Sequence, residues 1–250
     1  MTFTRTRTGP VVVITIDRPE KRNALTLEAV AELTEIVRAQ AQDPTVAGLV
    51  LTGNGAFCAG ADLRTIVDTG KKNAGGIQDT IEEGPQQLVR ALLDLPFPTV
   101  AALNGPAIGM GMDLALACDS RLLSRTGWMM QGWGRIGLIP GSGGELLIRE
   151  RNASILWRLL EEQKPIDGPQ AERWGLGESV EEDAVGAAVR RLETLALMPR
   201  AALTTYVSLF RSGLKARLDE HLTACSRAQV ALLTDARFES RVEHVVGSKS

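Results

Sequence analysis

Strand-forming runs alternate with helical patterns over the first half of this chain, and that alternation limits its fold more than any other feature. Val, Ile and Thr fill residues 11–16, which predicts a strand that ends at Asp17-Arg18-Pro19. Thr26 is a suitable N-cap for a helix that extends to about Gln42, with apolar residues on one face. Further strands are expected at residues 46–51, 99–103 and 119–124. This order predicts parallel strands joined by crossover helices in an α/β fold.

The pattern changes after Ser142, where strand-forming runs are absent. Helices are expected there at residues 145–160, 170–174, 183–197, 200–210 and 216–233. Residues 68–84 are polar and contain several glycines, so a mobile excursion is expected there, followed by a helix at residues 85–95. The sequence therefore predicts a β/α core over residues 1–194 and a helical C-terminal lobe over residues 195–250.

The composition argues against several classes of function. The net charge of −2 gives no support for binding to nucleic acid or to an anionic membrane. No apolar stretch approaches the roughly 20 residues of a membrane span, and the first residues lack the apolar core of a signal peptide. The three cysteines lie far apart without C-x-x-C spacing, and no His or carboxylate cluster has metal-ligand spacing. We therefore expect a cytoplasmic protein with no disulfide and no metal site.

Two glycine-bearing bends carry the strongest functional signal. The first is Phe57-Cys58-Ala59-Gly60-Ala61-Asp62-Leu63, and the second is Asn104-Gly105-Pro106-Ala107-Ile108-Gly109-Met110-Gly111-Met112-Asp113. Each bend can turn a backbone N–H group outward, and two such donors that converge on one oxygen form an oxyanion hole. A site of this kind stabilises the negative charge that develops when an acyl group becomes an enolate.

With these bends the chain resembles the crotonase superfamily, which contains the enoyl-CoA hydratases and isomerases. The resemblance covers nearly the whole chain and includes residues 16–19, 22–25, 51–55, 114–119, 137–144 and 171–176. It implies a superhelix of ββα units with a helical C-terminal lobe. It also implies an acyl-CoA thioester as substrate, no cofactor apart from the coenzyme A of that substrate, and a homotrimer or a dimer of trimers.

The resemblance further assigns roles to single residues. It implies that the N–H groups of Ala61 and Met110 form the oxyanion hole, with Met110 placed just before a helix that starts near Gly111. It also implies a substrate-binding set that consists of Ala24, Leu25, Ala59, Asp62, Leu63, Ile108, Trp133 and Leu138.

The acid/base residues depart from the pattern of the hydratases, which hold a water between two glutamates. Asp113 stands at the first position, where its carboxylate can still move a proton but equally fits a first-turn residue favoured by the helix dipole. Trp133 stands at the second position, and an indole cannot transfer a proton at neutral pH. Glu145 is the nearest compensating carboxylate in the sequence, with an ordinary first-turn glutamate as the alternative reading.

Three functions follow from these residues. The first is a divergent enoyl-CoA hydratase or isomerase, a lyase-like enzyme with Asp113 as its remaining carboxylate. The second is a catalytically inactive acyl-CoA binding or carrier protein. The third is a crotonase-type C–C or thioester hydrolase that uses Asp113 or Glu145.

Other motifs have weaker support. Residues 132–137 satisfy the dinucleotide pattern G-x-G-x-x-G, but Pro140 interrupts the helix that this pattern requires. Ser142 lacks the spacing of a nucleophile elbow. His221 and His244 lie in the helical C-terminal part and are expected at the surface.

Overall fold

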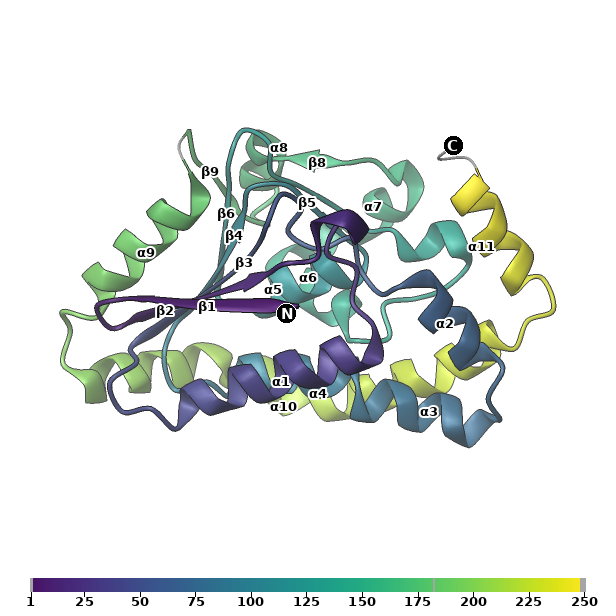
Figure 1. Ribbon diagram of the computed structural model, residues 1–250, viewed down its shortest axis with the longest axis horizontal. Coiled ribbons are helices and arrows are strands. Elements are labelled where there is room, and N and C mark those ends of the chain that lie inside the picture. The colour runs from purple at the N-terminus through teal and green to yellow at the C-terminus, as the bar shows by residue number, and fades with distance from the viewer. Residues whose placement is uncertain (1, 182, 248–250) are drawn as a thin grey trace.

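The computed structural model describes residues 2–181 and 183–247. A six-stranded sheet with the order β1-β2-β3-β4-β6-β9 lies at its centre (Figure 1). Its strands are β1 (Phe3–Thr8), β2 (Val11–Ile16), β3 (Gly48–Gly53), β4 (Thr99–Leu103), β6 (Ser120–Leu123) and β9 (Glu178–Ser179). β1 and β2 form an antiparallel hairpin, and all other neighbours are parallel. The predicted α/β fold with parallel strands is therefore confirmed.

A smaller sheet and a set of helices surround this centre. The smaller sheet has the order β5-β7-β8 and consists of β5 (Pro106–Ile108), β7 (Trp128–Met130) and β8 (Ile166–Asp167). The α-helices are α1 (Leu27–Ala41), α2 (Leu63–Gly70), α3 (Ala74–Glu83), α4 (Pro85–Asp94), α5 (Met110–Ala117), α6 (Gly144–Asn152), α7 (Leu156–Glu162), α8 (Gly168–Arg173), α9 (Ala184–Leu195), α10 (Arg200–Leu233) and α11 (Phe238–Gly247). Three short 3-10 helices are η1 (Pro19–Lys21), η2 (Trp133–Ile136) and η3 (Ala153–Ile155).

Both faces of the six-stranded sheet are covered, which explains why its strands are continuously apolar. In β2, Ile14 and Ile16 pack into the larger core with α1, α4 and α5. Val11 and Val13 point to the opposite face, where Leu192 of α9 packs against them. Figure 1 shows α9 lying across this face of the sheet. Since successive side chains of a strand alternate between faces, burial on both sides removes the apolar–polar alternation.

The region expected to be an excursion is helical, so that prediction is wrong. Asp62 is the N-cap of α2, where its carboxylate accepts a hydrogen bond from Arg64 N at 3.0 Å. Asn73 is the N-cap of α3, where its side chain accepts from Gly76 N at 2.8 Å. Single isoleucines at helical spacing, such as Ile77, anchor these helices in the core. Two capping residues and a few buried side chains are enough to form helices here, although most of the segment is polar.

Three predictions for the C-terminal half are also wrong. The two helices expected at 200–210 and 216–233 are one helix of 34 residues, which continues through Gly213. The helix expected at 145–160 is divided into α6 and α7 by η3, where the Asn152 side chain accepts from Ser154 N at 3.1 Å. Strands β8 and β9 occur where none was expected, and they are only two residues long. Such short strands depend on their neighbours and leave no periodic pattern in the sequence.

A buried ion pair ties α10 to the six-stranded sheet. Arg211 is 2% exposed and donates to both carboxylate oxygens of Asp119, at 2.8 and 2.6 Å. Its remaining N–H groups donate to the carbonyl oxygens of Leu93, Leu95 and Phe97. All five donors of the guanidinium are thus used, which fixes the position of α10. The division of the chain at residue 195 stays a prediction.

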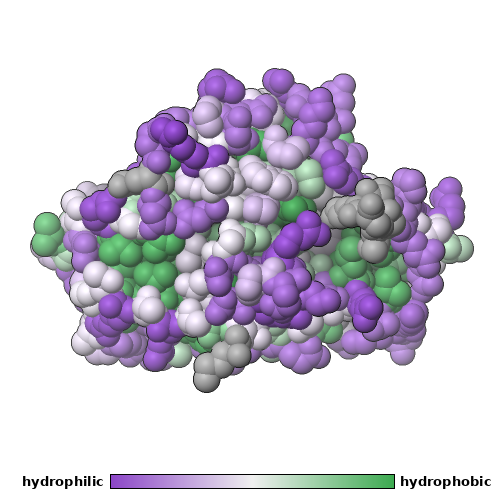
Figure 2. Space-filling model, turned by 45° about the horizontal axis from the view of Figure 1, so that its top comes forward, coloured by the Kyte–Doolittle hydropathy of each residue, from purple (hydrophilic) through white to green (hydrophobic). Residues whose placement is uncertain are grey.

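The surface in Figure 2 is mainly hydrophilic, and hydrophobic side chains gather in two areas, one at the left and one at the right near α11. Within the described ranges, no helix combines the length and the apolar character needed to cross a membrane.

Candidate functional site

The two glycine-bearing bends lie side by side in the structure. Cys58 and Ala107 form a parallel bridge, in which Ile108 N donates to Cys58 O at 2.9 Å and Cys58 N donates to Pro106 O at 3.1 Å. These backbone contacts bring together two segments that are about 50 residues apart, at the start of α2 and of α5.

Glycine is required at both bends. Gly60 has φ +101 and Gly109 has φ +53, conformations that other residues rarely adopt. A Cβ atom at Gly60 would lie 2.8 Å from Ile108 O and 3.5 Å from Met110 N. The first bend therefore lies against the amide of Met110.

The amides of Ala61 and Met110 are both available to a ligand. Leu25 N donates to Gly60 O and Asp62 N donates to Leu25 O, at 2.9 and 2.8 Å, so the Ala61 N–H points away from this bridge. Met110 is the first residue of α5 and has no acceptor within its helix. Over the described ranges, neither amide has a hydrogen-bond acceptor, and both residues line the same two cavities. The structure thus brings together the two residues that were predicted to form the oxyanion hole.

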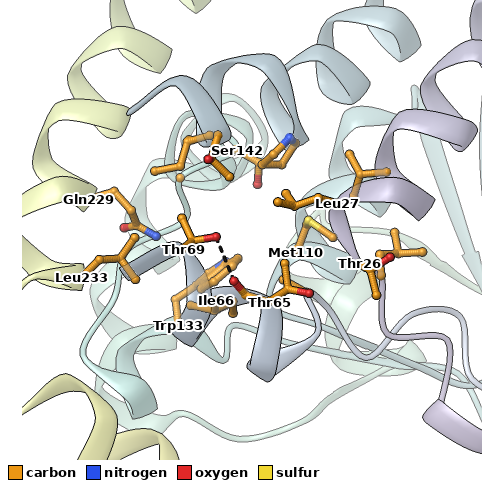
Figure 3. Close-up of a pocket in the computed structure, with 17 residues that line it drawn as sticks. Thr26, Leu27, Thr65, Ile66, Thr69, Met110, Trp133, Ser142, Gln229 and Leu233 are labelled. Atoms are coloured by element: carbon orange, nitrogen blue, oxygen red, sulfur yellow. Dashed lines mark hydrogen bonds between the residues drawn. The ribbon is translucent and has the colours of Figure 1, made fainter. Parts of the chain in front are cut away.

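The smaller cavity is apolar and has a volume of about 70 Å³. Figure 3 shows α1 residues on one side and α10 residues on the other, with Trp133 and Met110 between them. Its polar side chains include Thr65, Thr69, Ser142 and Gln229. The hydroxyl of Thr69 is already engaged, because it donates to Thr65 O at 2.8 Å. Ser142 and Gln229 were not predicted to line a site, since α6 and α10 approach it only in the folded chain.

The larger cavity adjoins the first and has a volume of about 700 Å³. Four cationic side chains line it, namely Lys21, Arg22, Arg64 and Arg135, together with the carboxylates Asp62 and Asp68. Asp62 already caps α2. Arg22 belongs to residues 22–25, which the family resemblance implies to be a turn that contacts coenzyme A, whereas Lys21, Arg64 and Arg135 were not predicted to line a site. These three lie on η1, α2 and η2, and only the folded chain brings them to one cavity.

Asp113 is fully buried behind the smaller cavity. Its Oδ2 accepts two hydrogen bonds, from Trp133 Nε1 at 3.0 Å and from Ser142 Oγ at 2.8 Å. Among the residues that the structure describes, its Oδ1 has no hydrogen-bond partner, and it lies so close to Gly144 that a Cβ atom there would overlap it. Burial raises the pKa of Asp113 from its ordinary value of 3.8 to about 7, although both hydrogen bonds act in the opposite direction.

Trp133 forms a wall between Asp113 and the cavities. Its side chain lines both cavities, and its ring packs over Gly109, where a Cβ atom would lie 3.7 Å from the indole. Its backbone N–H donates to Gln131 Oε1 at 2.8 Å, and this hydrogen bond helps to hold Trp133 in place. In the described part of the chain, Asp113 lines neither cavity. The indole and the Ser142 hydroxyl stand between its carboxyl group and any ligand.

Most of the other predicted site residues lie together. The larger cavity is lined by Ala24, Ala59, Asp62, Leu63 and Ile108, and the smaller one by Leu25. Leu138 is outside both linings and packs in the core. Glu145 also lies outside both cavities, and its carboxylate pairs with Arg149 at 3.7 Å and with His221 Nε2 at 3.3 Å. The roles of these residues stay predictions.

Two alternatives gain no support from the geometry. Residues 132–137 form the 3-10 helix η2 and not the first turn of an α-helix, so the context of a dinucleotide site is missing. His221 is half-buried in its pair with Glu145, which corrects the expectation of a surface residue, whereas His244 is exposed as expected.

Comparison with known proteins agrees with this geometry. A family model described as enoyl-CoA hydratase/isomerase matches residues 6–245. A probable enoyl-CoA hydratase of Rhodobacter capsulatus is 34% identical over 238 residues, which cover 93% of this chain and 90% of that protein. The 1,2-epoxyphenylacetyl-CoA isomerase of Escherichia coli is 36% identical over 172 residues, which cover 66% of this chain and 64% of that protein.

Solved structures show the same fold. The enoyl-CoA hydratase of Bacillus halodurans superimposes with a TM-score of 0.89 at 23% identity, over 98% of this chain and 100% of the other. With the family match over residues 6–245, these findings identify the predicted crotonase fold. The chain therefore belongs to the enoyl-CoA hydratase/isomerase family of the crotonase superfamily.

Proposed function

We propose that this protein binds an acyl-CoA thioester and holds its carbonyl oxygen between the N–H groups of Ala61 and Met110. The observation that carries this proposal is the pair of free amides on two adjoining cavities. Met110 is also the first residue of α5, so the positive end of the helix dipole adds to the field at the oxygen. Both effects favour an oxygen that gains negative charge over a neutral carbonyl.

The two cavities suit the two parts of such a ligand. The smaller cavity is apolar and accepts the acyl chain, while the larger one offers Lys21, Arg22, Arg64 and Arg135 to the phosphate groups of coenzyme A. The thioester lies where the cavities meet, since Ala61 and Met110 line both of them.

The acid/base groups favour isomerisation over hydration. Hydration requires one group to activate water and one to protonate carbon, whereas a double-bond shift moves one proton and needs a single acid/base group. Asp113 is the carboxyl group that forms hydrogen bonds with two lining residues of the smaller cavity, Trp133 and Ser142. We therefore propose enoyl-CoA isomerase-type chemistry through an enolate, with Asp113 as the proton store.

The position of Asp113 outside the smaller cavity also favours a second function. No Asp or Glu side chain lines the smaller cavity within the described ranges, so no carboxylate touches the acyl chain directly. An acyl-CoA binding or carrier protein without proton chemistry fits this arrangement. Hydrolysis gains no such support, because Glu145 is paired with Arg149 and His221 outside the cavities.

Titration with hexanoyl-CoA and assays with 2-enoyl-CoA and 3-enoyl-CoA test these functions. Binding with conversion between the two enoyl isomers supports the isomerase, and binding without any turnover supports the carrier. Formation of a 3-hydroxyacyl-CoA would contradict the preference for isomerisation. Absence of binding at millimolar ligand would overturn the proposal as a whole.

A matched pair of variants at Met110 tests the oxyanion hole itself. Met110→Pro removes the N–H at the first position of α5, where proline fits a helix, and Met110→Ala removes the side chain but keeps the N–H. We expect Met110→Pro to lower turnover about 100-fold relative to Met110→Ala, because one oxyanion donor is lost. Equal turnover in the two variants would show that this amide does not hold the oxygen.

We also propose that the protein is a homotrimer or a dimer of trimers. Tyr206, Leu209 and Phe210 of α10 are at least 60% exposed, which leaves apolar surface for contact with another copy. Light scattering with size-exclusion chromatography measures the mass, and Leu209→Arg is expected to shift it towards the monomer. A monomeric wild type would refute this.

A further inference from the structure

One hydroxyl connects the smaller cavity with the buried carboxyl group. Ser142 precedes α6, lines the smaller cavity, and places its Oγ 2.8 Å from Asp113 Oδ2. Trp133 also contacts both the cavity and Oδ2. An indole N–H can only donate, whereas a hydroxyl donates and accepts. A proton can therefore pass between the cavity and Asp113 through Ser142 but not through Trp133.

We propose that Ser142 is the group that exchanges a proton with the bound acyl chain, and that Asp113 is the proton acceptor behind it. This inference rests on the proposed binding of acyl-CoA. The proposal adds a catalytic hydroxyl to a site for which the sequence offered only the carboxylates Asp113 and Glu145 as proton-transfer groups. It also gives Asp113 a route to a cavity that Asp113 does not line.

The proton transfer balances without a further reactant. The Cα–H bond of the acyl group breaks, and its proton moves to Ser142 Oγ while the Ser142 proton moves to Asp113 Oδ2. The electron pair of the broken bond moves into the thioester and places negative charge on the carbonyl oxygen, where the amides of Ala61 and Met110 hold it. The reverse step returns a proton to the same carbon, or to a carbon two positions further along an unsaturated chain.

The two protonation states of Asp113 give Ser142 opposite roles. When Asp113 is ionised, Ser142 donates its hydrogen to Oδ2 and presents lone pairs to the cavity. When Oδ2 carries a proton, it donates to Ser142, whose own hydrogen then turns towards the cavity. Because burial raises the pKa of Asp113 to about 7, both states are populated near neutral pH.

The groups that face Asp113 leave its charge state free to change. Cys58 and Cys225 are the titratable neighbours whose pKa the Asp113 charge raises, and burial brings these values to about 12 and about 11. Both thiols are therefore neutral at pH 7. On α6, Glu145 is paired with His221 and Arg149 instead. In the described chain, no cationic side chain forms an ion pair with Asp113.

Exchange of the α-hydrogens of hexanoyl-CoA in D2O tests the relay separately from binding. We measure the dissociation constant by calorimetry and the exchange rate by mass spectrometry. Ser142→Ala and Asp113→Asn are each expected to lower the exchange rate about 100-fold or more, with the dissociation constant changed less than about threefold. Ser142→Thr keeps a hydroxyl and is expected to restore most of the rate. Thr34→Val removes a buried hydroxyl of α1 outside both cavities and serves as the control.

Each result of this experiment decides between specific readings. Exchange that survives in Ser142→Ala but not in Asp113→Asn would mean that Asp113 acts directly and would overturn the relay. Exchange that survives in both variants, or binding by the wild type without any exchange, would also overturn it while leaving the proposed binding intact. Absence of binding by the wild type would instead overturn the proposed function, and the relay with it.

Discussion

Replacement of Asp113 by Asn should change the pH dependence of stability. The wild-type carboxyl group is fully buried, and within residues 2–181 and 183–247 it has no cationic partner and one of its oxygens has no hydrogen bond. Its pKa is raised from 3.8 to about 7 on folding, so the folded state holds the proton more tightly than the unfolded state. This contribution to stability is fully present below about pH 4 and is lost as the pH rises to about 7.

The expected magnitude follows from the two pKa values. Keeping Asp113 buried costs about 2 kcal/mol at pH 5 and about 4 kcal/mol at pH 8, because ionisation favours the unfolded state increasingly over this range. Asparagine does not ionise and avoids this cost. Its amide nitrogen takes the place of an oxygen without a partner, which costs about 1 to 3 kcal/mol at every pH. The unfolding free energy of Asp113→Asn, taken relative to that of the wild type, should therefore increase by about 2 to 3 kcal/mol between pH 5 and pH 8.

Urea unfolding followed by circular dichroism at several pH values measures this difference. Asp79→Asn, at an exposed position of α3, controls for the loss of one carboxyl group. The informative quantity is the change of the unfolding free energy with pH. The cost of the amide is the same at every pH and does not contribute to that change. A free-energy difference between wild type and Asp113→Asn that stays the same from pH 5 to pH 8 would refute the assignment of a raised pKa to this group.

Four further variants test contacts at the site and elsewhere in the fold. Trp133→Phe removes a donor that stabilises the ionised form of Asp113, so the pH midpoint of α-hydrogen exchange should move to higher pH, and an unchanged midpoint would contradict this. Gly144→Ala should destabilise by about 1 to 3 kcal/mol in urea unfolding through overlap with the buried carboxyl group, whereas Gly213→Ala, in an open part of α10, should stabilise by about 0.5 to 1 kcal/mol. Arg211→Met leaves the partly buried carboxylate of Asp119 without its cationic partner and should lower the unfolding free energy by about 3 kcal/mol; a loss below 1 kcal/mol would show that the pair is not needed.

Local patterns were sufficient to predict the elements that are either buried on both faces or capped by a specific side chain. The strand at residues 11–16 and the helix that Thr26 caps are examples, and the order of such elements predicted parallel strands. The prediction divided α10 between residues 210 and 216, a stretch that contains Gly213. The helix continues there because Leu214 and Leu218 are buried, and tertiary packing outweighs the cost of about 1 kcal/mol for one glycine.

The backbone part of the site was more predictable than its side chains. Glycines marked the two bends and the family resemblance assigned Ala61 and Met110 within them, and the structure brings these bends together at the same cavities. The direction of the Asp113 side chain could not be predicted, because its partners come from η2 and from the turn before α6. Contacts of that kind depend on how distant elements pack, and no sequence spacing encodes them.

The origin of the cavity walls has a consequence for the synthesis of the protein. The smaller cavity has Leu27 at one side and Leu233 at the other, so its walls are completed only after α10 has left the ribosome. At typical elongation rates, about 10 to 40 s separate the synthesis of these two residues. During that interval the nascent chain already contains both amide-bearing bends but lacks the wall that α10 provides. The enclosed form of this cavity is therefore acquired late in translation.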